Sequence, residues 1–203
     1  MGYHTDLVGE FTLDKPLSKE HREYLKQFAE TRRMKRDSIL TDKRPDPIRK
    51  AAGLAVGIQG GFFVGEGGMA GQDSGKDILD YNHPPVGQPG LWCQWEPTED
   101  GTAIVWNSGE KFYRYTEWLI YLIEHFIKPW GYSLTGRVDW QGEDSDDIGV
   151  IWVRKNVVKA VKSTIVAEEP DWGDEDGGAS VAEPDIAPNP IEDVIADAMM
   201  GDD

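Results

Sequence analysis

A glycine-rich segment between residues 53 and 90 comes closest to a known chemical motif. The sequence GEGGMA, which begins at Gly65, satisfies the G-x-G-x-x-G/A spacing of dinucleotide-binding loops. Those loops bind pyrophosphate at the N-terminus of a helix, whereas no amphipathic helix follows here and Glu66 would repel a phosphate. We therefore expect tight turns, and keep a small-ligand or nucleotide-binding enzyme as an alternative hypothesis. The ligand-binding residues would be Gly65, Gly67, Gly68, Asp73, Trp92 and Trp95.

Nucleophilic and metal-binding side chains are few and lack the spacing of known sites. Cys93 is the single cysteine, and it shares one face of an alternating segment with Leu91 and Trp95, which is typical of a small core residue. No G-x-S-x-G sequence is present, and the four histidines do not follow a zinc-binding spacing. We therefore predict no catalytic residue, no metal site and no cofactor, and the sequence leans away from an enzyme.

A basic cluster lies between residues 32 and 36. Its members are Arg32, Arg33, Lys35 and Arg36. Such a cluster can bind the phosphates of a nucleic acid, so nucleic-acid binding is a second alternative. The acidic C-terminal region could equally fold back on the cluster and mask it. We therefore do not expect nucleic acid to be the main partner.

The negative charge of the chain is concentrated at its C-terminal end. The formal net charge is −16, and residues 165–203 contain 13 acidic residues and no Lys or Arg, which leaves 24 acidic against 21 basic residues in 1–164. Low hydrophobicity combined with high charge predicts disorder. We therefore divide the chain into an α+β domain at 1–164 and a disordered acidic tail at 165–203.

The last residues of the tail differ from the rest of it. Over residues 190–200, apolar residues return at helical spacing, with acidic residues on the other face. The apolar face consists of Ile191, Val194, Ile195 and Met199. A short amphipathic helix on a flexible linker is typical of a docking segment, so we predict that these residues bind a protein partner.

Hydrophobic periodicity predicts the secondary structure of residues 1–164. The predicted strands are 3–13, 91–96, 102–107, 132–140, 150–154 and 157–161, with a further short strand at 62–64. One predicted helix begins after Ser18, and a second covers residues 112–126. Residues 35–50, which contain two prolines and many charges, are predicted to form a loop. Because tight hairpins join the strands, we expect an α+β fold with a mainly antiparallel sheet, two helices on one face and a long Gly-rich loop.

Features of membrane and secreted proteins are missing from the sequence. The longest apolar stretch, 118–127, is interrupted by Glu124 and His125 and is shorter than a membrane span. The N-terminus has neither the basic start nor the apolar run of a signal peptide. We therefore predict a cytoplasmic protein with no membrane partner.

Three stretches of the sequence carry a resemblance to other proteins. They are MGYHTDLVGEF at the N-terminus, GGFFVGEGGMAGQD from Gly60, and LDYNHPPVGQPGLWCQWEPTEDGTAIVWNSGEKFYRYTEWLIYLIEHFIKPWGYSLTGRVDWQGED from Leu79. Over about residues 1–160 the chain resembles a group of small hypothetical proteins from bacteria and their phages. The resemblance implies a bacterial or phage origin and brings no catalytic residues with it. Our leading hypothesis is therefore a non-enzymatic, phage- or prophage-encoded interaction factor that binds a host or phage protein.

Overall fold

The computed structural model describes residues 2–66, 75–162 and 171, which form an α+β fold around one large antiparallel sheet. In this part of the chain the sheet has six strands in the spatial order β4-β5-β1-β6-β7-β8. They are β1 (Thr5–Leu13), β4 (Trp95–Pro97), β5 (Ala103–Trp106), β6 (Leu134–Gly142), β7 (Ile148–Arg154) and β8 (Val157–Lys162). Every neighbouring pair is antiparallel, so the fold class predicted from the hairpin signals is confirmed.

β1 lies inside the sheet and pairs with β6 along its whole length. The register joins Leu7 to Trp140 and Phe11 to Gly136. Because alternate residues of a strand point to opposite faces, the buried Leu7 and Phe11 share one face, whereas Val8, which is 70% exposed, lies on the other. We call the first face the core face and the face that carries Val8 the open face.

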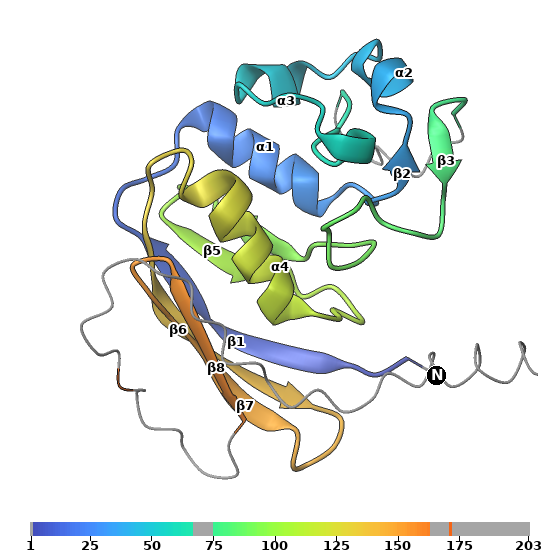
Figure 1. Cartoon of the computed structure of the whole chain (residues 1–203). Coiled ribbons are helices and arrows are strands. Elements are labelled where there is room, and N and C mark those ends of the chain that lie inside the picture. The colour runs from blue at the N-terminus through green and yellow to red at the C-terminus, as the bar shows by residue number, and fades with distance from the viewer. Residues whose placement is uncertain (1, 67–74, 163–170, 172–203) are drawn as a thin grey trace, which may run out of the picture.

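Two helices lie on the core face of the sheet (Figure 1). α1 (Lys19–Ala29) begins where the Ser18 hydroxyl accepts a hydrogen bond from the backbone N–H of His21 at 3.2 Å. α4 (Tyr115–Leu122) continues directly into a π-helical segment, η2 (Ile123–Ile127). The prediction of two helices on one face is therefore confirmed.

The core between the sheet and the helices is built largely from aromatic rings. Phe11 of β1 packs edge-on against Trp95 of β4, with 5.5 Å between the ring centroids. Phe28 of α1 packs in the same manner against Trp118 of α4 at 6.1 Å. All four side chains are fully buried, and burial of one such side chain stabilises the fold by roughly 1.5–3 kcal/mol. The first contact lies within the sheet and the second joins the two helices, and all four rings belong to one hydrophobic core.

The prediction of a loop over residues 35–50 is wrong. This segment contains β2 (Lys35–Arg36), α2 (Ser38–Asp42) and α3 (Pro47–Ala51). The Asp37 carboxylate caps α2 by accepting hydrogen bonds from two backbone N–H groups of its first turn. α3 begins with Pro47. A proline has no backbone N–H group, and at the first position of a helix that group would have no partner within the helix. Short helices that are capped in this way form even in a polar sequence with prolines.

The strand predicted at residues 62–64 does not form. Phe63 and Val64 are fully buried, but they follow a short 3-10 turn, η1 (Ile58–Gly60), in irregular chain. The nearby β3 (Ile78–Asp80) pairs instead with β2 in a separate two-stranded sheet. An arginine side chain, and not a neighbouring strand, donates a hydrogen bond to the Phe63 carbonyl of this segment.

The tail helix predicted at 190–200 lies outside the described residues, as does nearly all of the predicted tail at 165–203. The structure therefore leaves these two predictions untested. Within the described ranges, no helix combines the length and the apolar character that a membrane crossing requires.

Gly149 of β7 provides a test of the packing between the strands. It lies opposite Trp140 of β6, and an added Cβ would overlap the indole ring and the Val161 carbonyl of β8. Gly149→Ala should therefore force the ring or the strand to move and lower the free energy of unfolding by about 1–3 kcal/mol. Urea denaturation of the full chain measures the change.

Gly90→Ala is the matched control for this substitution. Its added Cβ would meet the Trp118 indole nitrogen at 3.6 Å, which is an ordinary contact. The control should change the free energy of unfolding by less than about 1 kcal/mol. Equal losses at the two glycines would contradict the packing argument.

Candidate functional site

Three arginine side chains contact Phe63, whose ring is buried. The guanidinium carbons of Arg36 and Arg44 lie 4.6 and 5.0 Å from the centre of the ring. Arg33 donates from Nη2 to the Phe63 carbonyl at 2.6 Å and lies over the ring of Phe28 in α1 at 4.3 Å. Desolvated contacts between a cation and a ring stabilise a fold by about 2 kcal/mol. Phe63 is therefore held in irregular chain by charged side chains and not by strand pairing.

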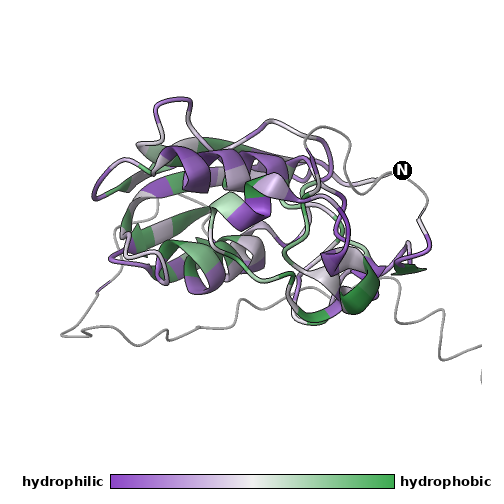
Figure 2. Cartoon of the chain, turned by 90° about the horizontal axis from the view of Figure 1, so that it is seen from above, coloured by the Kyte–Doolittle hydropathy of each residue, from purple (hydrophilic) through white to green (hydrophobic). Residues whose placement is uncertain are grey.

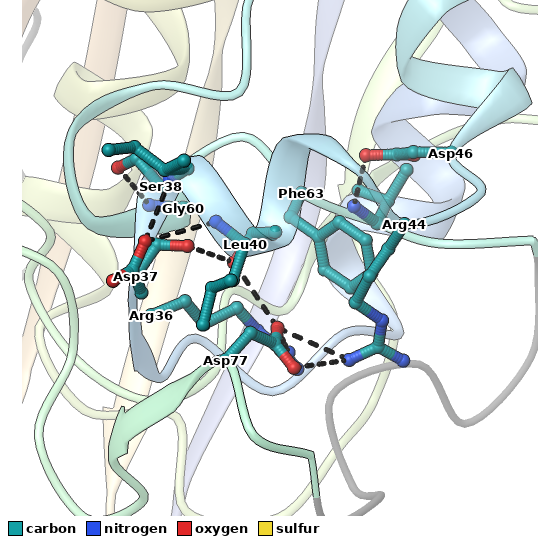
Figure 3. A network of polar contacts seen from close by, with 12 residues as sticks. Arg36, Asp37, Ser38, Leu40, Arg44, Asp46, Gly60, Phe63 and Asp77 are labelled. Carbon is teal, nitrogen blue, oxygen red and sulfur yellow. Dashed lines mark hydrogen bonds and ion pairs between the residues drawn. The ribbon is translucent and has the colours of Figure 1, made fainter.

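Asp77 is the carboxylate that pairs with two of these arginines (Figure 3). It accepts hydrogen bonds from Arg36 at 2.5 Å, from Arg44 at 3.1 Å and from the Thr41 hydroxyl of α2 at 3.2 Å. The Asp77 and Arg36 side chains are 6% and 1% exposed. Burial by itself raises the pKa of Asp77, but the hydrogen bonds and charges of the arginines outweigh it and hold the pKa below its usual value. The carboxylate is therefore ionised and joins α2 to the segment that leads into β3.

A second buried ion pair positions α3. Arg49 donates to Asp46 at 2.7 Å, to the Leu54 carbonyl at 2.8 Å and to Asp42 at 3.1 Å. The Val64 N–H also donates to Asp46, at 3.4 Å. Burial raises the pKa of Asp46, although the hydrogen bond and charge of Arg49 act in the opposite direction. One arginine thus joins the end of α2, α3 and the buried part of the Gly-rich segment.

Further hydrogen bonds fix η1 against α2 and against the segment that follows β3. The Ser38 hydroxyl donates to the Gly57 carbonyl at 3.0 Å and accepts from the Gly60 N–H at 3.3 Å. The side-chain oxygen of Gln59 accepts from the Val86 N–H at 3.0 Å. Gln59 also has a positive φ of 51°, a left-handed conformation that costs roughly 1–2 kcal/mol. Three segments that are distant in sequence are therefore held side by side.

The segments held in this way present large apolar side chains to solvent. Ile39 and Leu40 of α2 are 72% and 42% exposed, Ile58 of η1 is 75% exposed, and Val86 is 69% exposed. We call these four residues the apolar surface. Strongly hydrophobic ribbon is visible at this end of the molecule, outside the core of sheet and helices (Figure 2). Groups of exposed apolar side chains mark sites of protein interaction.

The residues predicted to bind a small ligand are only partly described. Those outside the described residues are Gly67, Gly68 and Asp73. Gly65 lies in a turn with a positive φ of 73°, as expected for a glycine of a tight turn. Trp95 is closed within the core, where its indole N–H donates to the Tyr115 carbonyl at 2.7 Å, and Trp92 is half-buried. Trp95 is therefore not accessible to a ligand, and the rest of the predicted site stays a prediction.

The predicted basic cluster is divided between the interior and the surface. Arg33 and Arg36 are buried in the contacts described above, and burial lowers the pKa of Arg33. Arg32 and Lys35 are half-buried, and Arg32 lies over the Tyr81 ring at 4.3 Å. The four side chains therefore do not form the continuous basic surface that phosphate binding requires.

Cys93 is a core residue, as its position in the alternating segment predicts. Burial raises the pKa of its thiol to about 12, so the thiol is protonated at neutral pH. The thiol donates to the Trp95 carbonyl at 3.8 Å. Across residues 2–66 and 75–162, no group of three or more His, Cys, Asp or Glu side chains could hold a metal ion.

No pattern in the sequence identifies the apolar surface. Ile39 and Leu40 lie in the segment predicted as a loop, and the other two residues lie in Gly-rich chain with no clear period. One usable signal is present, because Asp37 followed directly by Ser-Ile-Leu has the form of a helix cap before apolar residues. Three-dimensional packing is needed to bring Ile58 and Val86 beside that helix.

Comparisons with protein-family models, with curated proteins and with solved structures found no match to this chain. The geometry of the described residues is therefore the basis for the functional proposal.

Asp77→Asn tests whether the buried ion pairs hold this end of the molecule together. The substitution leaves Arg36 buried without its carboxylate, so the free energy of unfolding should fall by about 3–5 kcal/mol. Urea denaturation at neutral pH measures the loss. Asp42→Asn is the matched control, because this carboxylate also pairs with an arginine but is 60% exposed. The control should cost less than about 1 kcal/mol.

The Asp77 pair also makes stability depend on acid pH. Its pKa is lower in the folded protein than in the unfolded chain, where it is about 3.9. The contribution of Asp77 is therefore fully present above that value and is lost as the pH falls through the folded pKa. The stability difference between the wild type and Asp77→Asn should shrink as the solution is acidified. A difference that stays constant into the acid range would contradict the ion pair.

Proposed function

We propose that this protein is a non-enzymatic interaction factor that binds a protein partner through the apolar surface. Nine large apolar side chains are exposed in the described residues, and six of them fall between residues 39 and 86. These six are Ile39, Leu40, Ile58, Leu79, Tyr81 and Val86. Their concentration on a part of the chain that adds little to the core is the observation that carries the proposal.

The rigidity of the supporting segment favours this function. A docking surface binds more tightly when its side chains are ordered before the partner arrives, because less conformational entropy is lost on binding. The Arg36–Asp77 and Arg49–Asp46 pairs order the backbone beneath the apolar surface without a regular sheet. Buried ion pairs thus order a region that contributes more to the surface of the molecule than to its core.

The composition of the apolar surface indicates the chemistry of the partner. Its aliphatic side chains offer no hydrogen bonds, so the matching surface of the partner should present apolar side chains of its own. The exposed neighbours Asp42 and Lys43 carry opposite charges. The partner is therefore recognised by shape and apolar contact more than by net charge.

The resemblance of residues 1–160 extends the proposal to the setting of the protein. We propose a bacterial or phage origin, a cytoplasmic location, and a host or phage protein as the partner. The tail residues Ile191, Val194, Ile195 and Met199 would add a second docking segment. A pull-down that compares the full chain with residues 1–164 separates the two contributions.

Site-specific crosslinking tests the apolar surface directly. A photoreactive amino acid is placed at Ile58 of the full chain, and at Tyr113 as the control, because Tyr113 is also exposed but lies outside the apolar surface. Bacterial cells that produce either chain are irradiated. We expect a discrete protein adduct from position 58 and none from position 113. The same adducts at both positions, or none at either, would show that the surface does not dock a partner.

Negative charge introduced into the apolar surface should weaken binding of the partner. Ile39→Glu combined with Ile58→Glu should reduce recovery of the crosslinked partner at least tenfold, which corresponds to about 1.4 kcal/mol of lost binding. Exposed substitutions of this kind should change the free energy of unfolding by no more than roughly 0.5 kcal/mol each. Tyr113→Ser should leave both quantities unchanged. Undiminished recovery by the double variant would refute the proposal.

A further inference from the structure

The open face of the sheet has a part whose burial no described helix explains. Val150 of β7 pairs laterally with Asp139 of β6 and with Val161 of β8, and the register of β1, β6, β7 and β8 places all three on the open face. Nevertheless Val150 is only 4% exposed. The indole N–H of Trp152, two residues along the same face, is also buried and has no hydrogen-bond partner among the described residues. The Arg137 guanidinium lies over the Trp152 ring at 5.0 Å, whereas Val161 is 38% exposed, so an apolar part of this half of the face stays open among the described residues.

The one described residue of the C-terminal region, Asp171, contacts this half of the open face. Lys159 of β8 stands beside Trp152 on the open face, and its ammonium group donates to the backbone carbonyl of Asp171 at 2.7 Å. Residues 163–170 separate Asp171 from the end of β8 at Lys162. The backbone of Asp171 therefore lies at the Lys159 side chain, next to the open face.

The charges on the two sides of this contact are complementary. Residues 148–162 contain four basic residues and no Asp or Glu. The four are Arg154, Lys155, Lys159 and Lys162. Residues 165–176 contain six acidic residues, no basic residue and the one tryptophan of the tail, Trp172. An indole combined with carboxylates matches a surface on which apolar side chains are bordered by cations.

We propose that residues 165–176 of the same chain dock on the open face over β7 and β8. Trp172 packs against the row formed by Val150, Trp152 and Val161, and the neighbouring carboxylates lie beside Arg154 and Lys159. β8 is an edge strand, and an uncovered edge beside an apolar face invites pairing with other chains. The docked segment covers that surface, so the acidic region acts as an intramolecular cover on the side of the sheet that the helices leave open.

Paramagnetic broadening in the full chain tests this contact. The buried Cys93 is replaced by Cys93→Ala, and a nitroxide is attached at Gly177→Cys, which leaves every acidic residue of the tail in place. In the 15N-labelled protein we expect loss of the Trp152 indole N–H signal and of the Val150 and Val161 amide signals. The amide signal of Ile58, on the apolar surface, should persist. A Trp152 signal that persists as well would overturn the proposal.

Two controls define the origin of the broadening. Lys159→Glu with Arg154→Glu should restore the Trp152 signal, whereas Lys50→Glu, at an exposed position of α3, should not. Broadening that survives the double charge reversal would contradict the electrostatic contact. Mixing nitroxide-labelled chain with 15N-labelled chain that has no nitroxide should leave Trp152 sharp. Broadening in the mixed sample would assign the face to a second copy and overturn an intramolecular cover.

Hydrogen exchange of the unmodified chain gives a readout that does not depend on the cysteine substitutions. In about 1 M sodium chloride, where the Debye length is about 3 Å, the carboxylates of the tail lose most of their attraction for Arg154 and Lys159. Amide exchange in β8 should then accelerate, while exchange in β1, at the centre of the sheet, stays unchanged. Equal exchange in β8 at low and high salt would count against the proposal.

Discussion

The guanidinium groups around Phe63 are the interaction on which the irregular part of the molecule depends. This part has short helices and a small two-stranded sheet, so much of its backbone lacks partners in regular structure. Arg33 and Arg49 donate to the carbonyls of Phe63 and Leu54, and Asp77 balances the charge of Arg36. Removal of a carboxylate from such a set leaves a buried cation, which costs far more than an exposed ion pair contributes.

The sheet and its two helices depend on a different constraint. Here alternation along the strands and helical spacing along α4 place apolar residues on one side of each element, and hydrophobic burial then determines the arrangement. Phe28 connects the hydrophobic core to the arginine cluster, because its ring packs against Trp118 in the core and against the guanidinium of Arg33. The charged cluster is thereby connected to the most strongly buried part of the fold.

This difference explains what could be predicted from the sequence. Periodic elements such as β1, β6 and α4 leave a pattern that local reasoning detects. Arg33 and Arg36 have no such pattern, and in the sequence they are indistinguishable from surface charges, so the sequence predicts a basic cluster. Only the positions of Phe63 and Asp77, which lie 30 and 41 residues away from their arginine partners, show that these cations are interior. The apolar surface escapes prediction for the same reason, because its members lie far apart in the chain.

The choice of arginine connects the buried cluster to the exposed surface. A guanidinium can lie flat on an aromatic ring and donate hydrogen bonds from its edge at the same time, which the ammonium group of lysine does less well. Arg36 uses both capacities, on Phe63 and on Asp77. The interior of this segment is therefore ordered with few aliphatic side chains. Ile39 and Ile58 are not needed to build a core, and they remain exposed on an ordered backbone, as the proposed docking surface requires.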